Sequence, residues 1–355
     1  MQSALFAPLE LRGIRIPNRV FMSPMCQYSA VDGMPHEWHL VHLGSRAVGG
    51  AGLVLAEATA VVPEGRISPG DTGIWGDAHM EAWSRIASFV KAQGAVAAIQ
   101  LGHAGRKASC HEPWHGGAPL AADEGAWQTV APSPVPFAES DPEPRELTPA
   151  EIDALPGVFA AAARRATTAG FQAVELHMAH GYLLHQFLSP ISNQRQDAWG
   201  GGLENRMRLP LAVASAVREA LGESRLLLAR VSCTDWVEGG WDLDQTVAFA
   251  SRLKAIGVDL VDCSAGGMVP KAPMRTGPGF MTPFATQVRR GAGMPTATVG
   301  FITQPAQAEQ IVATGLADAV LLARELLRDP YWPLHAAREL GVDVAWPNQY
   351  LRAKR

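Results

Sequence analysis

Long apolar runs are missing from this sequence of 355 residues. Its longest apolar stretch is far shorter than the roughly 20 residues of a membrane-spanning helix, and no basic start followed by an apolar segment marks a secretory signal. Basic patches are missing too, because 30 Lys and Arg against 34 Asp and Glu give a net charge of −4. We therefore expect a cytoplasmic protein that binds neither membranes nor nucleic acid.

Cysteine is scarce and scattered. The sequence has 4 cysteines and no CxxC pair, which excludes a disulfide framework and a zinc or iron–sulfur site built on cysteines. Hydrophobic residues make up 47% and charged residues 18% of the chain, an ordinary globular composition that excludes a disordered protein or a coiled coil. The composition therefore predicts a globular protein with a large hydrophobic core.

Short apolar segments alternate with longer helical ones along the chain. The predicted strands are Arg19–Met25, Gly52–Val61, Ala95–His103, Ala173–His180, Leu226–Ser232, Val258–Ser264, Pro295–Gly300 and Ala317–Arg324. The predicted helices are His36–Val48, Ala78–Gln93, Pro149–Ala169, Leu203–Leu221, Asp244–Ile256, Thr282–Arg290, Gln304–Thr314 and Pro330–Leu340. Because the strands are nearly continuous in apolar residues, as buried parallel strands are, the pattern predicts an α/β fold of the (β/α)8 TIM-barrel type.

The chain is longer than a bare barrel, which needs about 250 residues. The additional residues fall mostly after strands, in the predicted loops Ala104–Leu147, Tyr182–Gly202 and Ala265–Met281. Strand and helix flank the first of these loops in register, so we interpret residues 1–355 as one domain with long loops at the C-terminal face. That first loop carries Trp114 and Trp127 and is expected to affect access to a site there.

Polar residues gather where the predicted strands end. Gln100, His177, His180 and Arg230 occupy these ends, and the C-terminal ends of barrel strands build the active site in this fold. Two histidines can ligate a metal, which keeps a metal-dependent barrel hydrolase or lyase as an alternative. Neighbouring arginines favour instead two imidazoles that hydrogen-bond a substrate oxygen.

The last two predicted strands indicate a phosphate site. Gly300 permits close approach of a backbone and Arg324 offers a bidentate partner, at the loops where this fold commonly binds phosphate. The alternative is that Arg324 forms a salt bridge with Glu325 or Asp329.

Several motifs together resemble the Old Yellow Enzyme family of FMN-dependent ene-reductases, in particular the bacterial group that includes xenobiotic reductase A. The matching segments are Pro17-Asn18-Arg19-Val20, Ser23-Pro24-Met25-Cys26-Gln27-Tyr28, Gln100-Leu101-Gly102-His103-Ala104-Gly105-Arg106-Lys107, His177-Met178-Ala179-His180-Gly181-Tyr182-Leu183, Phe187-Leu188-Ser189-Pro190, Gly200-Gly201-Gly202-Leu203-Glu204-Asn205-Arg206 and Glu325-Leu326-Leu327-Arg328-Asp329-Pro330. The resemblance covers essentially the whole chain. One departure is Ala323, where some members have glycine before the arginine.

The resemblance implies noncovalent FMN and NADPH or NADH as the reductant. The implied FMN contacts are Ser23, Pro24, Met25, Cys26, Ala58, Gln100, Arg230, Gly300, Ala323 and Arg324. The implied acceptor contacts are Tyr28, His177, His180 and Arg352, with Tyr182 as the proton donor. Within this scheme Cys26 tunes the flavin potential and Arg230 stabilises the reduced flavin.

The implied reaction is reduction of activated C=C bonds in α,β-unsaturated carbonyl or nitro compounds. Nitro compounds, nitrate esters and quinones are alternative acceptors within the same family. The tail at residues 341–355 resembles a segment that inserts an arginine, here Arg352, into the site of a neighbouring subunit, which predicts a homodimer or homotetramer.

Overall fold

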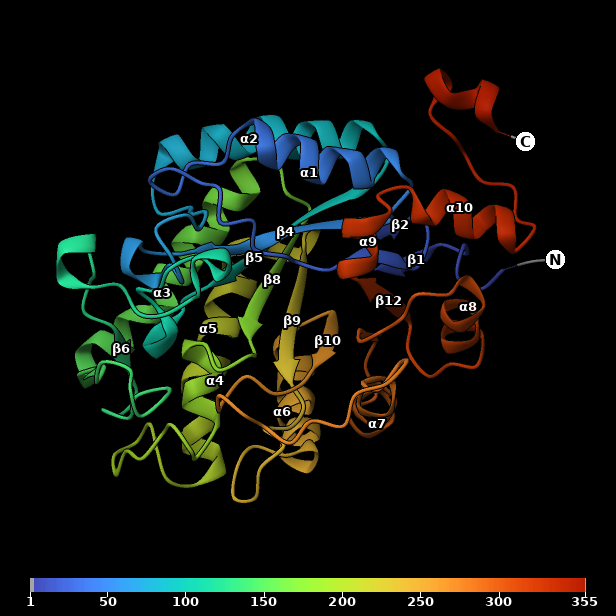
Figure 1. The fold of residues 1–355 in the computed structure, drawn as a ribbon. Coiled ribbons are helices and arrows are strands. Elements are labelled where there is room, and N and C mark those ends of the chain that lie inside the picture. Colours follow the sequence, from blue (N-terminus) through green and yellow to red (C-terminus); the bar gives the residue numbers. More distant parts are fainter. Residues whose placement is uncertain (1–2, 355) are drawn as a thin grey trace.

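The computed structural model describes residues 3–354 and contains a closed parallel barrel with the strand order β3-β4-β5-β8-β9-β10-β11-β12 (Figure 1). The barrel strands are β3 (Val20–Met22), β4 (Leu53–Ala60), β5 (Val96–Gly102), β8 (Ala173–Met178), β9 (Leu226–Ser232), β10 (Leu260–Ser264), β11 (Thr296–Thr298) and β12 (Ala319–Leu322). The outer helices are α1 (Glu37–Val48), α2 (Asp77–Ala92), α3 (Pro149–Thr168), α5 (Leu203–Leu221), α6 (Leu243–Ile256), α7 (Thr282–Ala292), α8 (Pro305–Ala313) and α10 (Trp332–Glu339). The predicted (β/α)8 fold is confirmed.

Several predicted strands are too long at their C-terminal ends. The segment Ser23–Met25 is an extended loop after β3, because Pro24 has no N–H for the ladder. His180 lies in a turn after β8, Gly300 lies beyond β11, and Arg324 begins the short helix α9 (Arg324–Arg328). In each case the chain leaves the ladder where its side chains reach the barrel mouth.

Shorter elements decorate the barrel. An antiparallel hairpin, β1 (Leu9–Leu11) and β2 (Ile14–Ile16), precedes the first barrel strand, and α4 (Leu183–Leu188) follows β8. The loop between β5 and α3 contains the two-residue strands β6 (Val130–Ala131) and β7 (Arg145–Glu146). Single-turn helices occur at Pro63–Gly65, Gly105–Lys107, Pro113–His115, Ala122–Glu124 and Gly222–Ser224. Within residues 3–354, every helix is too short or too polar to serve as a bilayer span.

The interior of the barrel is a separate apolar cluster at the N-terminal ends of the strands. Phe21, Leu53, Val96 and Leu226 are among its members, and each is at most 3% exposed. Ile16 of the hairpin belongs to the same cluster, so the hairpin closes this end of the barrel. The barrel is therefore a packed core that is open for function only at the opposite end.

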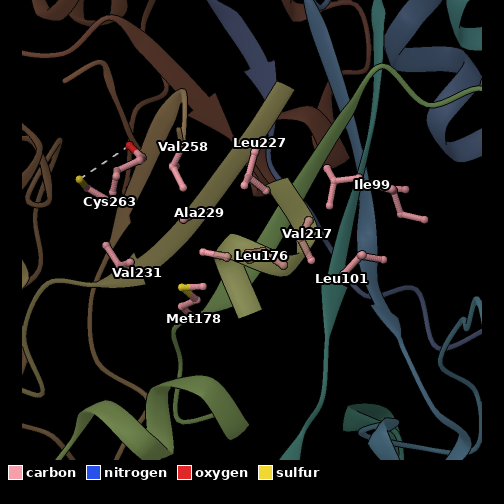
Figure 2. Close-up of a cluster of buried hydrophobic side chains, with 14 of the residues drawn as sticks. Ile99, Leu101, Leu176, Met178, Val217, Leu227, Ala229, Val231, Val258 and Cys263 are labelled. Atoms are coloured by element: carbon pink, nitrogen blue, oxygen red, sulfur yellow. Dashed lines mark hydrogen bonds between the residues drawn. The ribbon is translucent and has the colours of Figure 1, made fainter. Parts of the chain in front are cut away.

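A second cluster fills the space between strands and helices. Figure 2 shows outward side chains of β5, β8 and β9, such as Ile99, Leu176 and Ala229, beside Val217 of α5. Side chains at positions i and i+2 of these strands pack outward, whereas their neighbours point into the barrel. This alternation decides which polar residues enter the site.

Candidate active site

The inner face of the barrel changes from apolar to polar along the strands. On β9, Leu228 in the apolar cluster is followed two residues later by Arg230, and on β10 Leu260 is followed by Asp262. The same spacing places Gln100 of β5 on the inner face. Because alternate residues share a face, these polar side chains meet at the C-terminal mouth, where active sites of this fold lie.

Arg230 is a buried cation held by a residue of β10 and a residue of the loop after β3. Its Nη1 donates to the hydroxyl of Ser23 at 3.0 Å, and its Nε lies 3.2 Å from Oδ2 of Asp262. The side chain is only 8% exposed and that of Asp262 is 0% exposed. The pair fixes the guanidinium at the base of the mouth, where it can stabilise a negative charge on a ligand.

Gln100 is oriented by a buried carboxyl group. Its Nε2 donates to Oε1 of Glu175 at 2.7 Å. Burial, together with the negative charge of Asp262, raises the pKa of Glu175 to about 8, although Arg230 opposes the rise. Glu175 is therefore largely protonated at neutral pH and adds little negative charge to the mouth.

His177 has a defined tautomer. The backbone N–H of Ala179 donates to Nδ1 at 3.3 Å, so the hydrogen of the neutral ring lies on Nε2. Burial lowers the pKa of His177 well below its usual value, and the positive charge of Arg230 lowers it further. The ring is thus a neutral hydrogen-bond donor.

His180 lies in a turn with a φ of 59° and faces the same space. Its ring centroid is 5.1 Å from that of His177, with the ring planes almost perpendicular. Nε2 of His180 lies 2.7 Å from the hydroxyl of Ser264, and a hydroxyl that donates there leaves the ring hydrogen on Nδ1. Burial and the charge of Arg230 also lower the pKa of His180 well below its usual value.

Tyr182 completes the cluster. Its ring centroid lies 4.8 Å from that of His177 in an edge-to-face arrangement. Burial, followed by the nearby Cys26, raises the pKa of Tyr182 well above its usual value, so the phenol keeps its proton. The ammonium of Lys107 lies 5.1 Å from the same ring centroid and donates to the carbonyl of His180 at 2.9 Å.

The turn between His180 and Tyr182 requires glycine. Gly181 has a φ of +75°, and a Cβ placed on it would lie 2.1 Å from the carbonyl oxygen of Gly267. Its N–H donates to Nδ1 of His185 at 2.9 Å, and its carbonyl accepts from Nε2 of Gln186 at 2.7 Å. His180 and Tyr182 therefore flank a turn that the buried side chains of His185 and Gln186 hold in place.

The segment after β3 brings the predicted flavin contacts Ser23, Pro24, Met25 and Cys26 to the mouth. Glu57 anchors it, because its Oε2 accepts from the N–H of Gln27 at 3.0 Å. Burial raises the pKa of the Cys26 thiol well above its usual value, with help from the carboxyl groups of Asp71 and Glu57. Cys26 is therefore a neutral thiol.

Two further predicted contacts lie on either side of that segment. Ala58 pairs with Gln100 across a β-bulge between β4 and β5, so it faces the mouth. Tyr28 follows Cys26 and packs edge-to-face against Trp114, with ring centroids 5.7 Å apart. Burial and the neighbouring Cys26 raise the pKa of Tyr28 above its usual value.

The predicted phosphate contacts come from the ends of β11 and β12. Gly300 has a φ of +107°, and a Cβ there would lie 2.8 Å from the ring of Phe280. Arg324 opens α9 directly after Ala323, and its guanidinium lies 4.7 Å from the ring centroid of Phe301. Backbone and cation thus meet at one side of the mouth.

The alternative pairing of Arg324 is not found. Glu325 pairs with Arg328 at 2.9 Å, and Asp329 pairs with His335 at 2.7 Å. The exposed guanidinium of Arg324 therefore remains available for an anionic ligand.

These residues fit FMN by their chemistry. The ligand's phosphate suits the exposed guanidinium of Arg324, and its ring system suits a mouth lined by Ala58, Gln100 and the buried cation of Arg230. Within the part of the chain that the structure describes, no three His, Cys, Asp or Glu side chains converge as a metal ion requires. One nitrogen of each histidine is instead occupied by a hydrogen bond within the protein, to the N–H of Ala179 and to the hydroxyl of Ser264.

Arg352 is not brought to this site within the same chain. It lies on the exposed 3-10 helix Asn348–Ala353 of the tail. Figure 1 shows this helix at the top of the view, whereas the arrowheads of β8 and β9 point to the bottom.

Some residues of the site were missed by sequence reasoning. Asp262 and Ser264 lie two residues apart on β10, the spacing that identified other inward positions, and this signal could have found them. Lys107 belongs to one of the family motifs, and Glu175 belongs to a predicted strand, but the sequence assigned neither residue a role. Their partners lie on other strands, so their roles needed the fold.

Fold and site together define a flavin-dependent oxidoreductase on a (β/α)8 barrel. Comparison with known families agrees, because the model of the NADH:flavin oxidoreductase / NADH oxidase family matches residues 4–342. The chain belongs to this family, which is the Old Yellow Enzyme family predicted from the motifs.

Individual relatives support the same assignment. The chain is 45% identical to an NADPH dehydrogenase of Geobacillus thermodenitrificans over 100% of both chains. Morphinone reductase has a similar structure, with a TM-score of 0.79 and 29% identity over 98% of this chain and 92% of that one. An Old Yellow Enzyme homologue of Zymomonas mobilis has a TM-score of 0.77 and 25% identity over 97% of both chains. The protein is an NADPH-dependent oxidoreductase with FMN as its cofactor.

Proposed function

We propose that the enzyme is an ene-reductase, which reduces the activated C=C bond of α,β-unsaturated carbonyl or nitro compounds. The observation that carries this proposal is the cluster of His177, His180 and Tyr182, whose rings pack edge-to-face at centroid distances of 5.1 and 4.8 Å. Two neutral imidazole donors beside a neutral phenol suit an acceptor that gains negative charge on oxygen and a proton on carbon.

The proposed FMN contacts line the mouth from several strands. They are Ser23, Pro24, Met25, Cys26, Ala58, Gln100, Arg230, Gly300, Ala323 and Arg324, and none of them forms a covalent bond to the cofactor. When bound, the reduced FMN supplies hydride to the β-carbon of the acceptor. Arg230 holds a positive charge at the base of the mouth, and the neutral thiol of Cys26 tunes the polarity there.

The histidines bind and polarise the acceptor oxygen. Nε2–H of His177 is free to donate because Nδ1 already accepts from Ala179. The low pKa values of both histidines keep the rings neutral, so they stabilise the developing enolate as donors without surrendering a proton. Tyr28 adds a contact from the segment after β3.

Tyr182 protonates the α-carbon. Its raised pKa keeps the phenol protonated in the resting enzyme. The ammonium of Lys107, 5.1 Å from the ring centroid, stabilises the phenolate that remains after proton transfer. Lys107 is positioned for this by the carbonyls of His180 and Gly267, at 2.9 and 3.2 Å.

The test is anaerobic oxidation of the NADPH-reduced enzyme by a panel of enones, nitroolefins, nitrate esters and quinones. We expect the enones and nitroolefins to be reduced fastest, with saturated products. A panel in which only quinones or nitrate esters reoxidise the enzyme would assign the alternative acceptor class.

We also propose that the tail completes the acceptor site of a neighbouring subunit in a homodimer or homotetramer. The tail leaves the barrel after α10, and the hydroxyl of its Tyr350 lies 3.4 Å from that of Tyr331. Tyr350 and Leu351 are 40% and 49% exposed, which is costly for a tail without a partner. Arg352 on the same turn is the proposed acceptor contact.

Deletion of residues 346–355 tests the tail. The deletion should weaken association and raise KM for acceptors while FMN stays bound, as measured by analytical ultracentrifugation and steady-state kinetics. Arg352→Ala should raise KM without changing the oligomer. A truncated enzyme with unaltered mass and kinetics would rule the proposal out.

A further inference from the structure

The loop between β5 and α3 lies near β6 on the left side of Figure 1. Its residues line a cavity of about 700 Å³. This volume is in the range of pockets that hold drug-sized ligands. Small and apolar side chains make up most of the wall, including Ala108, Pro113, Ala118, Pro119, Leu120, Ala122, Ala126, Trp127, Phe137 and Ala138. Such a wall suits an apolar ligand with flat faces.

The cavity adjoins the acceptor site. Tyr28 and Lys107 lie in its wall, and the ammonium of Lys107 donates to the carbonyl of His180. Ile67 lies in the wall of this cavity and also in the wall of a smaller space lined by His177 and Tyr182. That smaller space holds only about 10 Å³, so the link to the acceptor site is Tyr28, which lines the cavity and is also a proposed acceptor contact.

The cationic side chains of the wall already donate to acceptors within the protein, so they do not require an anionic ligand. The guanidinium of Arg106 donates to the carbonyls of Val135, Pro136 and Met268, at 3.1, 3.2 and 2.8 Å. Lys107 donates to two carbonyls and lies 4.4 Å from the ring centroid of Phe137. The rest of the wall is mainly aromatic and aliphatic carbon, interrupted by polar side chains that include His111, Asp141 and Glu143.

The loop that forms the wall is held in place. The indole N–H of Trp127 donates to the carbonyl of Glu64 at 2.9 Å. Nη1 of Arg195 donates to the carbonyls of Pro132 and Leu147, at 2.9 and 2.7 Å. Because these bonds tie the loop to separate parts of the barrel, the cavity is formed before a ligand binds and little ordering is needed.

We propose that this cavity is a subsite for a bulky, neutral aromatic substituent of the acceptor. The inference rests on the proposed ene-reductase function and adds the acceptor class: enones that carry an aryl group of two rings. Aryl burial against Trp127 and Phe137 lowers KM for such acceptors relative to small ones.

The test compares two enones that differ only in the substituent on the β-carbon. They are 3-penten-2-one, with a methyl group, and 4-(biphenyl-4-yl)-3-buten-2-one, with a two-ring aryl group. Ala138→Trp and Cys110→Trp each fill the cavity from a different part of the loop. Asp123→Trp adds the same side chain at an exposed loop position outside the wall and serves as the control.

We expect each filling variant to lower kcat/KM for the biphenylyl enone by about 10-fold or more, with the value for 3-penten-2-one within about twofold of wild type. Calorimetric titration of the biphenylyl ketone into oxidised holoenzyme should show the same loss of affinity. The Asp123→Trp enzyme should match wild type in both measurements.

Two results would overturn the proposal. One is an unchanged ratio between the two enones in both filling variants that retain FMN and a wild-type Tm. The other is an unchanged ratio with slower reduction by NADPH, which would assign the cavity to the reductant. Failure of wild type to reduce 3-penten-2-one would instead refute the ene-reductase function itself.

Discussion

Burial keeps the titratable side chains around the acceptor in their neutral forms. It lowers the pKa values of His177 and His180 and raises those of Tyr182 and Cys26. Each group is therefore present as a hydrogen-bond donor with its proton in place, and none is a standing charge. The positive charge of the mouth comes instead from Arg230, which Asp262 holds, and from Lys107 beside Tyr182.

His177→Ala tests whether this single residue stabilises the negative charge on the acceptor oxygen. The variant should slow reoxidation by enones by about 10²–10³-fold, because one donor to the developing enolate is lost. Stopped-flow measurement of the two half-reactions checks this, and reduction by NADPH is the internal control because it forms no enolate. Enone reoxidation at the wild-type rate would make His177 a structural residue.

Glu175→Gln tests the neutral carboxyl beside Gln100. The folded pKa of about 8 lies above the ordinary value of 4.5, so the folded protein binds a proton that the unfolded chain releases between these values. Protonated Glu175 therefore makes its full contribution to the free energy of unfolding below about pH 4.5. This contribution is lost as the pH rises towards 8. Glutamine does not titrate, so the Tm of the variant relative to wild type should rise from pH 5 to pH 8.

The check is thermal unfolding at several pH values in matched ionic strength. A Tm difference between variant and wild type that stays constant with pH would mean that Glu175 does not titrate in this window.

At the scale of elements, the turn after β8 decides whether the site forms. It places His180 and Tyr182 on either side of Gly181, and α4 begins directly after it. Buried His185 holds the turn through the N–H of Gly181 and lies 3.1 Å from Oδ1 of Asp235. Burial alone would raise the pKa of Asp235, but His185 and hydrogen bonds from Ser189 and Trp241 lower it.

Gly181→Ala tests this turn against a matched control. Gly181 and Gly201 have φ values of +75° and +76°, but only at Gly181 does a Cβ meet another atom, the carbonyl oxygen of Gly267 at 2.1 Å. Gly201→Ala should therefore cost about 1–2 kcal/mol of left-handed strain. Gly181→Ala should lower the free energy of unfolding by more than this, as measured by Tm. It should also impair ligand binding at the acceptor site, as measured by titration with a phenol. Equal losses in the two variants would mean that the turn relaxes.

At the scale of the whole molecule, the proposed FMN contacts come from parts of the chain that are distant in sequence. Arg230 and Ser23, which meet at the mouth, are 207 residues apart. A ligand that contacts both, and Arg324 as well, binds only the closed barrel and so stabilises it.

Removal of FMN should therefore lower the Tm. At a free ligand concentration of 100 times Kd the bound flavin stabilises the fold by about 2.7 kcal/mol, which predicts a loss of several degrees on its removal. Differential scanning calorimetry of apo and reconstituted enzyme checks this, and the flavin released by heat should be FMN. An identical Tm, or released FAD, would contradict the assignment of the mouth as an FMN site.

The amino-acid sequence by itself determined the barrel. Leu226–Ser232 and Leu203–Leu221 were predicted with the bounds that β9 and α5 have, because continuous apolar runs and helical periodicity are local signals. It also predicted Gln100, His177 and Arg230 as site residues, since each is a polar residue in an otherwise apolar strand. The family, with FMN and with NADPH or NADH as the reductant, was predicted from its motifs, and the comparisons confirm FMN and NADPH.

Only the tertiary structure decided how these residues behave. Asp262 matters because β10 lies beside β9, and the pKa values of the histidines depend on burial by several strands. The strand ends at Pro24 and His180 were misplaced, because Pro24 cannot donate to the ladder and His180 lies in a turn with a φ of 59°. The cavity beneath the β5–α3 loop depends on hydrogen bonds such as those of Arg195, which join residues far apart in the chain. Burial and long-range contact are properties of the fold, and no local pattern contains them.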